Sequence, residues 1–206
     1  ASQHWLERAL SLAPADAAAE RQLGNLFVQS KDFRKARHHL ERAVALGPDE
    51  ADNWNYLIAL LNTIGDAPAA ERALAAGLVR CPQSPSLHYE RGRRLSAAGR
   101  LDEATAELET ARRLRPEAAN AYVELAMIDF RRGRIDAGIE KLRGAVAVEP
   151  GQPMALIALA RYAIDQADAI GAREWLRRAR QQPKVLPQDL DAMTRAYQQK
   201  FGRLPW

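Results

Sequence analysis

Residues 51–84 read ADNWNYLIALLNTIGDAPAAERALAAGLVRCPQS, and this 34-residue pattern recurs along the chain. Pro82, near the end of this stretch, belongs to a series of prolines that stand 34 residues apart and that we call the ladder prolines. A constant period of this length is typical of repeat architectures, in which each unit packs mainly against its neighbours. The sequence therefore predicts a repeat array whose function depends on the surfaces of its units. The series consists of Pro14, Pro48, Pro82, Pro116 and Pro150.

Small and large apolar residues hold fixed places within the unit, in which each ladder proline is position 32. Small residues at positions 8 and 20 allow two helices to approach closely, and leucines at positions 7 and 24 fill the space beside them. Gly65, Gly99 and Gly133 near position 15 are expected to end the first helix in the left-handed conformation that glycine tolerates. The proline ends the second helix, because its ring cannot continue the hydrogen-bond ladder. Each unit is therefore predicted to be a pair of antiparallel helices.

This pattern resembles the tetratricopeptide repeat (TPR) family over nearly the whole chain. Residues 51–84 carry Trp54, Leu57, Ala70 and Pro82 at the family's positions 4, 7, 20 and 32, and Leu23, Gly24 and Phe27 match in the preceding unit. The resemblance implies an all-α fold, a right-handed superhelical α-solenoid of helix-turn-helix units. We expect a single TPR domain over 1–206. It would comprise the second helix of a truncated repeat at 1–16, repeats at 17–50, 51–84, 85–118, 119–152 and 153–186, a capping helix at 187–202 and a tail at 203–206.

The two ends depart from the regular unit. Leu6 and Ala9 align with positions 24 and 27, so the first segment matches a second helix without its partner. We expect that the parent protein continues upstream and that this exposed half repeat could mediate self-association. Pro187 to Phe201 is predicted to form a further helix, with Gly202 at its end.

Composition excludes several classes of function. The chain has 206 residues with 30 basic and 26 acidic side chains, a net charge of +4, and no long basic run, so we expect no nucleic-acid binding. No apolar stretch is long enough to cross a bilayer, so membrane insertion is not expected. A single cysteine, Cys81, excludes an internal disulfide framework. The compartment stays open between cytoplasm and periplasm, and the composition, rich in alanine, arginine and proline, is typical of a GC-rich bacterium.

Catalysis has little support in the sequence. His38 and His39 are adjacent and should face different sides of a helix, so they cannot share a metal as an i,i+4 pair would. Both are expected on a solvated helix surface, and Cys81 is expected to be a bystander in a turn between repeats. No glycine-rich phosphate loop is present. We therefore predict no enzymatic activity and no cofactor or metal.

The resemblance also indicates where a partner would bind. In the TPR family the first helices line a concave groove, into which positions 2, 5, 9, 12 and 13 point. The polar half of the groove would bond a peptide backbone and acidic groups, and the apolar half would take hydrophobic anchors or, alternatively, pack internally. The expected partner-binding residues are Arg21, Asn25, Asp52, Asn55, Asn62, Tyr89, Arg93, Val123, Met127, Phe130, Arg131, Met154, Ile157, Arg161 and Ile164.

Three functions remain open at this point. The first is a non-catalytic scaffold that binds a peptide or helix of a partner protein in the groove. The second is a docking or oligomerisation arm of a larger multidomain enzyme or of an envelope or secretion assembly protein. The third is an RNA-binding helical repeat, whose affinity would fall steeply with salt.

Overall fold

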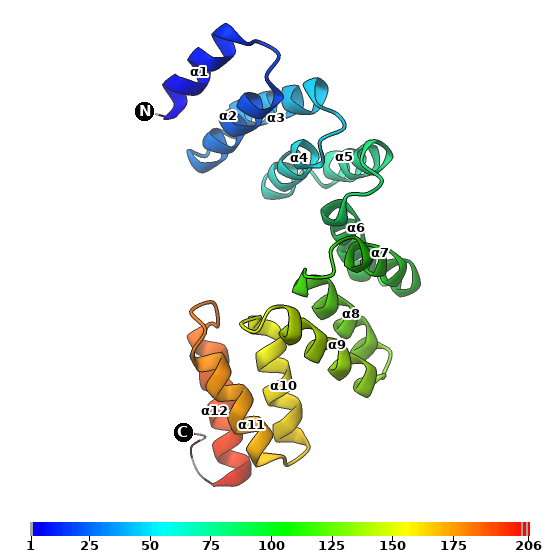
Figure 1. Cartoon of the computed structure of the whole chain (residues 1–206), viewed down its shortest axis with the longest axis vertical. Coiled ribbons are helices and arrows are strands. Elements are labelled where there is room, and N and C mark those ends of the chain that lie inside the picture. The colour runs from blue at the N-terminus through cyan, green and yellow to red at the C-terminus, as the bar shows by residue number, and fades with distance from the viewer. Residues whose placement is uncertain (1, 203, 205) are drawn as a thin grey trace. The chain divides into compact units, whose positions relative to one another are not determined.

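The computed structural model describes residues 2–202, 204 and 206, with side chains from residue 4 onward. These residues form twelve α-helices and no strand (Figure 1). The helices divide into two compact groups, Ala1–Arg91 and Gly92–Trp206, and the division falls within α6. The helices are α1 (Ser2–Leu12), α2 (Ala17–Gln29), α3 (Phe33–Leu46), α4 (Ala51–Thr63), α5 (Ala67–Arg80), α6 (Pro85–Ala97), α7 (Leu101–Leu114), α8 (Ala119–Arg131), α9 (Ile135–Val148), α10 (Pro153–Asp165), α11 (Ala169–Arg180) and α12 (Pro187–Phe201).

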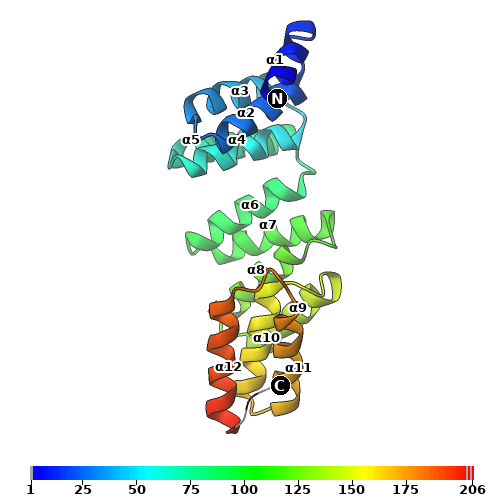
Figure 2. The same ribbon diagram turned by 90° about the vertical axis from the view of Figure 1, so that its left-hand side faces the viewer.

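Each predicted 34-residue unit contains two helices. The two helices of a unit lie side by side, as α2 and α3 do in the first group and α8 and α9 in the second (Figure 2). Aspartates begin several of these helices by accepting a backbone hydrogen bond: Asp16 Oδ1 accepts from the Ala19 amide at 3.0 Å and Asp66 Oδ1 from the Ala69 amide at 3.1 Å. Such caps satisfy an amide that has no partner within the helix.

The predicted glycine turns are confirmed. Gly65, Gly99 and Gly133 have φ of +77°, +76° and +71°, the left-handed conformation that ends each first helix. The equivalent position in the first and last complete units is not glycine, yet Lys31 and Ala167 adopt φ of +61° and +58°. The turn geometry is therefore kept by the repeat even where the residue is unfavourable for it.

Close approach of the paired helices is also confirmed. A Cβ added at Gly24 in α2 would lie 2.5 Å from Cγ of Leu40 in α3, and one added at Gly92 would lie 2.6 Å from Cγ of Leu108. Both leucines are fully buried. The small residue at position 8 thus receives the leucine at position 24, which is the contact that the repeat pattern predicts.

The last helix, α12, has the bounds expected from its sequence, and Gly202 follows it with φ of +69°. Its Tyr197 is fully buried in a cluster with Ile164 of α10 and Leu176 of α11. The Tyr197 hydroxyl donates a hydrogen bond to the Ala169 carbonyl at 3.3 Å. The apolar face that α10 and α11 present is therefore covered by a helix of the same chain.

Candidate functional site

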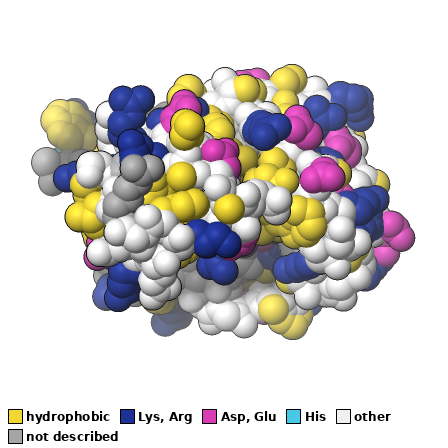
Figure 3. Space-filling model, turned by 90° about the horizontal axis from the view of Figure 1, so that it is seen from below, with side chains coloured by type: hydrophobic (Ala, Val, Ile, Leu, Met, Phe, Trp, Pro, Cys, Tyr) yellow, Lys and Arg dark blue, Asp and Glu magenta, His cyan; other side chains and the backbone are white. Residues whose placement is uncertain are grey.

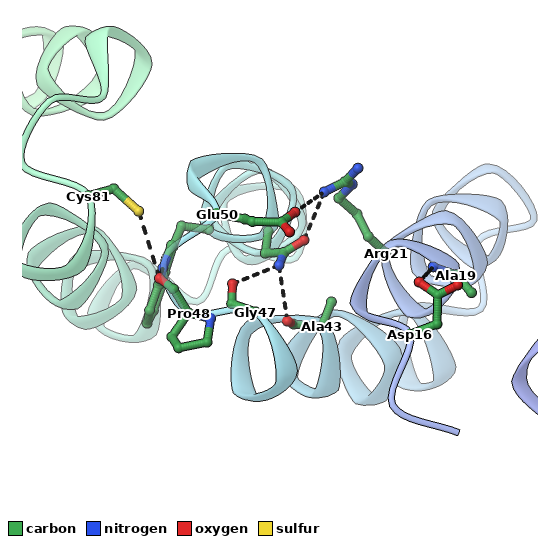
Figure 4. Close-up of polar contacts among 10 residues, drawn as sticks. Asp16, Ala19, Arg21, Ala43, Gly47, Pro48, Glu50 and Cys81 are labelled. Carbon is green, nitrogen blue, oxygen red and sulfur yellow. Dashed lines mark hydrogen bonds and ion pairs between the residues drawn. The ribbon is translucent and has the colours of Figure 1, made fainter. Parts of the chain in front are cut away.

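The expected partner-binding residues belong to α2, α4 and α6 in the first group, and to α6, α8 and α10 in the second. In the first group, Arg21 of α2 is engaged within the protein. Its Nη1 donates to Asn53 Oδ1 at 2.9 Å and lies 3.4 Å from Glu50 Oε2 (Figure 4). Asn53 is itself fully buried, and its Nδ2 donates to the carbonyls of Ala43 at 3.1 Å and Gly47 at 2.8 Å. Arg21 therefore completes a polar network between consecutive units.

The amides expected to bond a peptide backbone have partners in the protein as well. Asn55 Nδ2 donates to Ser86 Oγ at 2.8 Å, and Asn62 Nδ2 donates to Glu90 Oε1 at 3.3 Å. Asn25 is half-buried and Asp52 is exposed. Tyr89 of α6 is half-buried. A ligand on these helices would compete with several existing hydrogen bonds.

In the second group the apolar residues of the expected site separate by burial. Val123 and Ile164 are each 4% exposed and belong to the core. Phe130 is half-buried against Gly138, where an added Cβ would lie 2.3 Å from the ring. Val123 and Ile164 follow the internal-packing alternative, and the Phe130 ring, half-buried like Met127 and Ile157, is partly covered by α9.

Three apolar side chains of α8 and α10 remain accessible on this helix face. Met127 and Ile157 are half-buried, and their inner sides pack against the core. Met154, at the start of α10, is 55% exposed. We call Met127, Met154 and Ile157 the apolar patch.

The cations beside the apolar patch differ in how far they are neutralised. Arg93 lies 3.6 Å from Glu124, and Arg161 Nε donates to Asp165 at 3.1 Å. Arg131 is exposed and donates to the carbonyl of Ser96 at 2.9 Å and to its hydroxyl at 3.1 Å. Because serine is neutral and Arg131 has no acidic partner among the described residues, its charge remains uncompensated.

A polar hollow of about 450 Å³ opens between α10 and α12. Arg161 and Asp165, which are paired, lie on one side of it, and Gln199 and Lys200 lie on the other.

In the face of the molecule that Figure 3 shows, basic, acidic and apolar side chains are interspersed, with no extended area of one charge sign.

The prediction for the adjacent histidines is half right. His38 is exposed as expected, but His39 is half-buried, stacks on Phe27 with ring centres 5.3 Å apart, and has Nδ1 2.6 Å from Glu20 Oε2. Glu20 is 1% exposed and also lies 2.9 Å from Arg42 Nε. A buried carboxylate needs such partners, and the sequence signal for this cluster was the acidic residue at position 4, where the next unit has tryptophan.

Cys81 is buried, and its Sγ donates to the Pro48 carbonyl at 3.7 Å (Figure 4). Burial raises the pKa of the Cys81 thiol above its usual range, so the thiol stays protonated at neutral pH. Within the described part of the chain, no group of three His, Cys, Asp or Glu side chains is arranged to hold a metal ion. The same residues include no helix that is long and apolar enough to cross a membrane.

Paired antiparallel helices repeating every 34 residues define a helical repeat protein. A family model described as tetratricopeptide repeat matches residues 21–85, 89–146 and 123–185, and the chain belongs to that family.

Two curated relatives are similar in sequence. Cellulose synthase 1 operon protein C of Komagataeibacter xylinus is 26% identical over 178 residues. Cellulose synthase operon protein C of Xanthomonas axonopodis pv. citri (strain 306) is 31% identical over 189 residues. Each alignment covers 86% of this chain and 12% of the relative, so the chain spans a small part of the length of these proteins.

Solved structures share the fold. PilF of Pseudomonas aeruginosa aligns with a TM-score of 0.77 at 19% identity, over 90% of this chain and 84% of that one. YrrB, described as a TPR protein with an unusual peptide-binding site, aligns with a TM-score of 0.61 at 17% identity, over 92% of this chain and 97% of that one. The all-α TPR fold is thus established from both sequence and structure.

Proposed function

We propose that the chain is a non-catalytic protein-interaction scaffold, and that the first-helix face of residues 119–165 binds an extended segment of a partner protein. The observation that carries this proposal is the combination of the exposed apolar patch with the uncompensated charge of Arg131 on neighbouring helices. Exposed apolar surface with a polar rim commonly marks an interaction site. The peptide-binding site described for YrrB supports peptide binding as a use of this fold.

The spacing of these features specifies the partner's chemistry. Met154 is at position 2 of its unit and Arg131 is at position 13 of the preceding one, so they lie near opposite ends of the first helices. Eleven positions at about 1.5 Å per residue separate them by roughly 16 Å along the helix direction. An extended chain covers that length in about five residues. We therefore infer a partner segment with an apolar side chain at one end and an acidic side chain about five residues away.

Each end of the segment has a physical reason to bind. Methionine is flexible and polarisable, so Met127 and Met154 can adapt to different apolar side chains. The planar guanidinium of Arg131 can bind a carboxylate through two parallel hydrogen bonds. Asn25, Asn55, Asn62 and the other polar residues of the first group stay candidates for secondary contacts, since Asn55 and Asn62 would have to exchange their hydrogen bonds to Ser86 and Glu90.

The direct test compares two matched surface substitutions. Met154→Glu places a charge in the apolar patch, whereas Ile170→Glu places the same charge at an 83% exposed isoleucine of α11, outside that face. The immobilised chain would capture its partner from an extract of the source bacterium. Calorimetry would then give the affinity of the captured segment. We expect about a tenfold weaker affinity for Met154→Glu, equivalent to about 1.4 kcal/mol, and no change for Ile170→Glu.

Equal weakening by both substitutions would contradict binding at this face, because it would indicate a general effect of charge. Thermal unfolding of both variants provides the stability control. Arg131→Gln supplies a second probe: it should weaken binding of the acidic segment but not of a segment whose acidic residue has been replaced by glutamine.

A second candidate function is favoured by the sequence relatives. Because both are named as cellulose synthase operon protein C, we propose as the alternative that this repeat array is part of a larger bacterial protein acting in envelope polysaccharide assembly, where it docks or oligomerises that protein. Removing the codons for residues 17–186 from the gene should then abolish export of the polysaccharide while leaving its synthesis in cell extracts intact. Unchanged export would refute this alternative.

Docking through the first helix can be measured separately. Trp5 and Leu12 of α1 are 65% and 81% exposed, which favours self-association through this helix. Sedimentation of the wild-type chain should depend on concentration, and Trp5→Glu/Leu12→Glu should remain monomeric. A wild-type chain that is monomeric at all concentrations would exclude this contact.

A further inference from the structure

A second hollow lies on a different surface, among the second helices of the first group. It has a volume of about 550 Å³ and is bounded by α3, α4 and α5. Its lining includes Trp54, which is only 8% exposed, and, around it, Val44, Ala76 and Val79. Val79 is 79% exposed although it is apolar. This surface is independent of the first-helix face proposed above.

The same junction, between the second helix of one repeat and the first helix of the next, occurs again two repeats later. There a side chain of the protein itself occupies the space beside the aromatic ring. Tyr122 occupies the repeat position of Trp54, and Arg112 occupies that of Val44. The guanidinium carbon of Arg112 lies 5.5 Å from the centre of the Tyr122 ring. Arg112 Nε donates to Glu109 Oε2 at 2.7 Å, which holds the guanidinium in place. The aromatic ring at position 4 is thus covered by a cation that the chain itself provides.

The junction one repeat further on is closed in another way. Val146 and Leu156 occupy the same two positions, and both are buried, at 5% and 0% exposure. An aliphatic pair therefore packs without an arginine. Of these three junctions, only the one at Trp54 combines an aromatic ring with a short valine, and the small part of Trp54 that stays exposed borders the hollow together with Arg80.

The carboxylate that would hold a guanidinium is also present in the first group. Glu41 occupies the repeat position of Glu109, one helical turn before Val44 on α3. Glu41 Oε1 accepts from Arg37 Nε at 2.7 Å, and Arg37 Nη1 donates to Asp66 at 3.1 Å. One cation is therefore shared between two carboxylates, which leaves this cluster with a net negative charge. The hollow's own arginine, Arg80, is paired with Asp49 at 2.7 Å.

We propose that the hollow over Trp54 binds an arginine side chain of a partner protein. The aliphatic stem of this arginine packs between Val44 and Val79, its guanidinium lies against the indole, and Glu41 pairs with it as Glu109 pairs with Arg112. A guanidinium suits this place better than an ammonium ion, because it is planar, stacks on aromatic rings and is weakly hydrated. The surface thus selects a basic, arginine-containing segment, whereas the first-helix face selects an apolar and acidic one.

The test is an NMR titration of the ¹⁵N-labelled chain with acetyl-Gly-Arg-Gly-amide, followed at the assigned indole N–H of Trp54. The control peptide replaces arginine with citrulline, which has nearly the same shape but no charge. We expect saturable shifts with the arginine peptide and about tenfold weaker binding of the citrulline peptide, the size of a partly desolvated cation–π and ion-pair contribution.

Three variants locate the site. Val44→Arg should fill the hollow from within, as Arg112 does, and abolish the shifts, whereas Ala59→Arg adds the same charge at an exposed position of α4 and should preserve them. Glu41→Gln should weaken binding severalfold, and because Glu41 is exposed this variant is expected to fold even if Val44→Arg does not. Equal affinities for the arginine and citrulline peptides, or unchanged binding by Glu41→Gln, would each overturn the proposal.

Discussion

Replacing Asn53 by alanine tests whether a buried amide joins consecutive repeats. Asn53 is fully buried and makes three side-chain hydrogen bonds: it donates to the carbonyls of Ala43 and Gly47, and it accepts from Arg21. The other first helices have an apolar residue at this position of the repeat, so the network belongs to this junction. We expect Asn53→Ala to lower the free energy of unfolding markedly although the substitution improves helix propensity.

The expected loss in the free energy of unfolding depends on which hydrogen bonds the two carbonyls keep after the substitution. Each carbonyl keeps a backbone hydrogen bond, from the amides of Gly47 and Glu50 respectively, so neither is left wholly unpaired. Losing two buried bonds therefore costs about 1 kcal/mol each. The space left by the amide group adds about 1 kcal/mol, while half-buried Arg21 can recover its bond with water or Glu50. The expected loss is about 2–3 kcal/mol.

Urea unfolding followed by circular dichroism measures this loss, and hydrogen exchange of the amides of residues 43–58 localises it. Local exchange is needed because repeat arrays can unfold in parts. The matched control is Asn25→Ala, the same change at a half-buried first-helix position, which should alter stability by no more than about 0.5 kcal/mol. A loss for Asn53→Ala no larger than that of the control would refute a structural role for the network.

Three further substitutions have defined outcomes. Lys31→Gly should raise the free energy of unfolding by about 0.5–1 kcal/mol, measured by urea unfolding. The substitution removes about 1–2 kcal/mol of left-handed backbone strain, and the greater entropy that glycine loses on folding costs about 0.5–1 kcal/mol. A loss of stability would show that the lysine side chain matters more than its φ of +61°. Gly138→Ala should cost about 1–3 kcal/mol, since its Cβ would meet the Phe130 ring at 2.3 Å, and an unchanged melting temperature would show that the ring moves away freely. Burial alone would raise the pKa of Asp129, but hydrogen bonds from Lys141 and Arg134 lower it overall below the ordinary value of 3.8. The Asp129 carboxylate therefore stabilises the folded protein above pH 3.8, and this stabilisation is lost as the pH falls through the folded-state pKa. Asp129→Asn should therefore lower stability at pH 7 and flatten its decline below pH 4, and the exposed control Asp191→Asn should leave that decline unchanged.

The features that repeat along the chain were predictable from the sequence. Helix pairing, the left-handed glycine turns and the contact between positions 8 and 24 depend on local sterics, which the 34-residue period displays several times. The helix starting at Pro187 was likewise marked by its own start and stop residues. In each case several positions report the same physical constraint, so a single unusual residue does not obscure it.

Features that occur once were harder to predict. Glu20 and Asn53 are polar residues at positions where other units have larger or apolar side chains, and their partners come from different helices. The expected partner-binding residues lie on the first helices, as the repeat pattern predicts, but helix position does not determine burial. Ile164 is covered because α12 packs over it, and Val123 is covered by a cluster that includes residues of the next repeat, such as Leu156 and Leu159. Such long-range packing is not contained in the repeat period.

Photo-crosslinking tests the proposed first-helix binding face most directly. A benzoylphenylalanine placed at position 154 would lie in the apolar patch, and one placed at position 170 would lie at a more exposed site on α11. With the captured partner present, position 154 should crosslink to a segment containing an acidic residue, and position 170 should not crosslink. Crosslinking from position 170 without crosslinking from position 154 would contradict binding at the first-helix face.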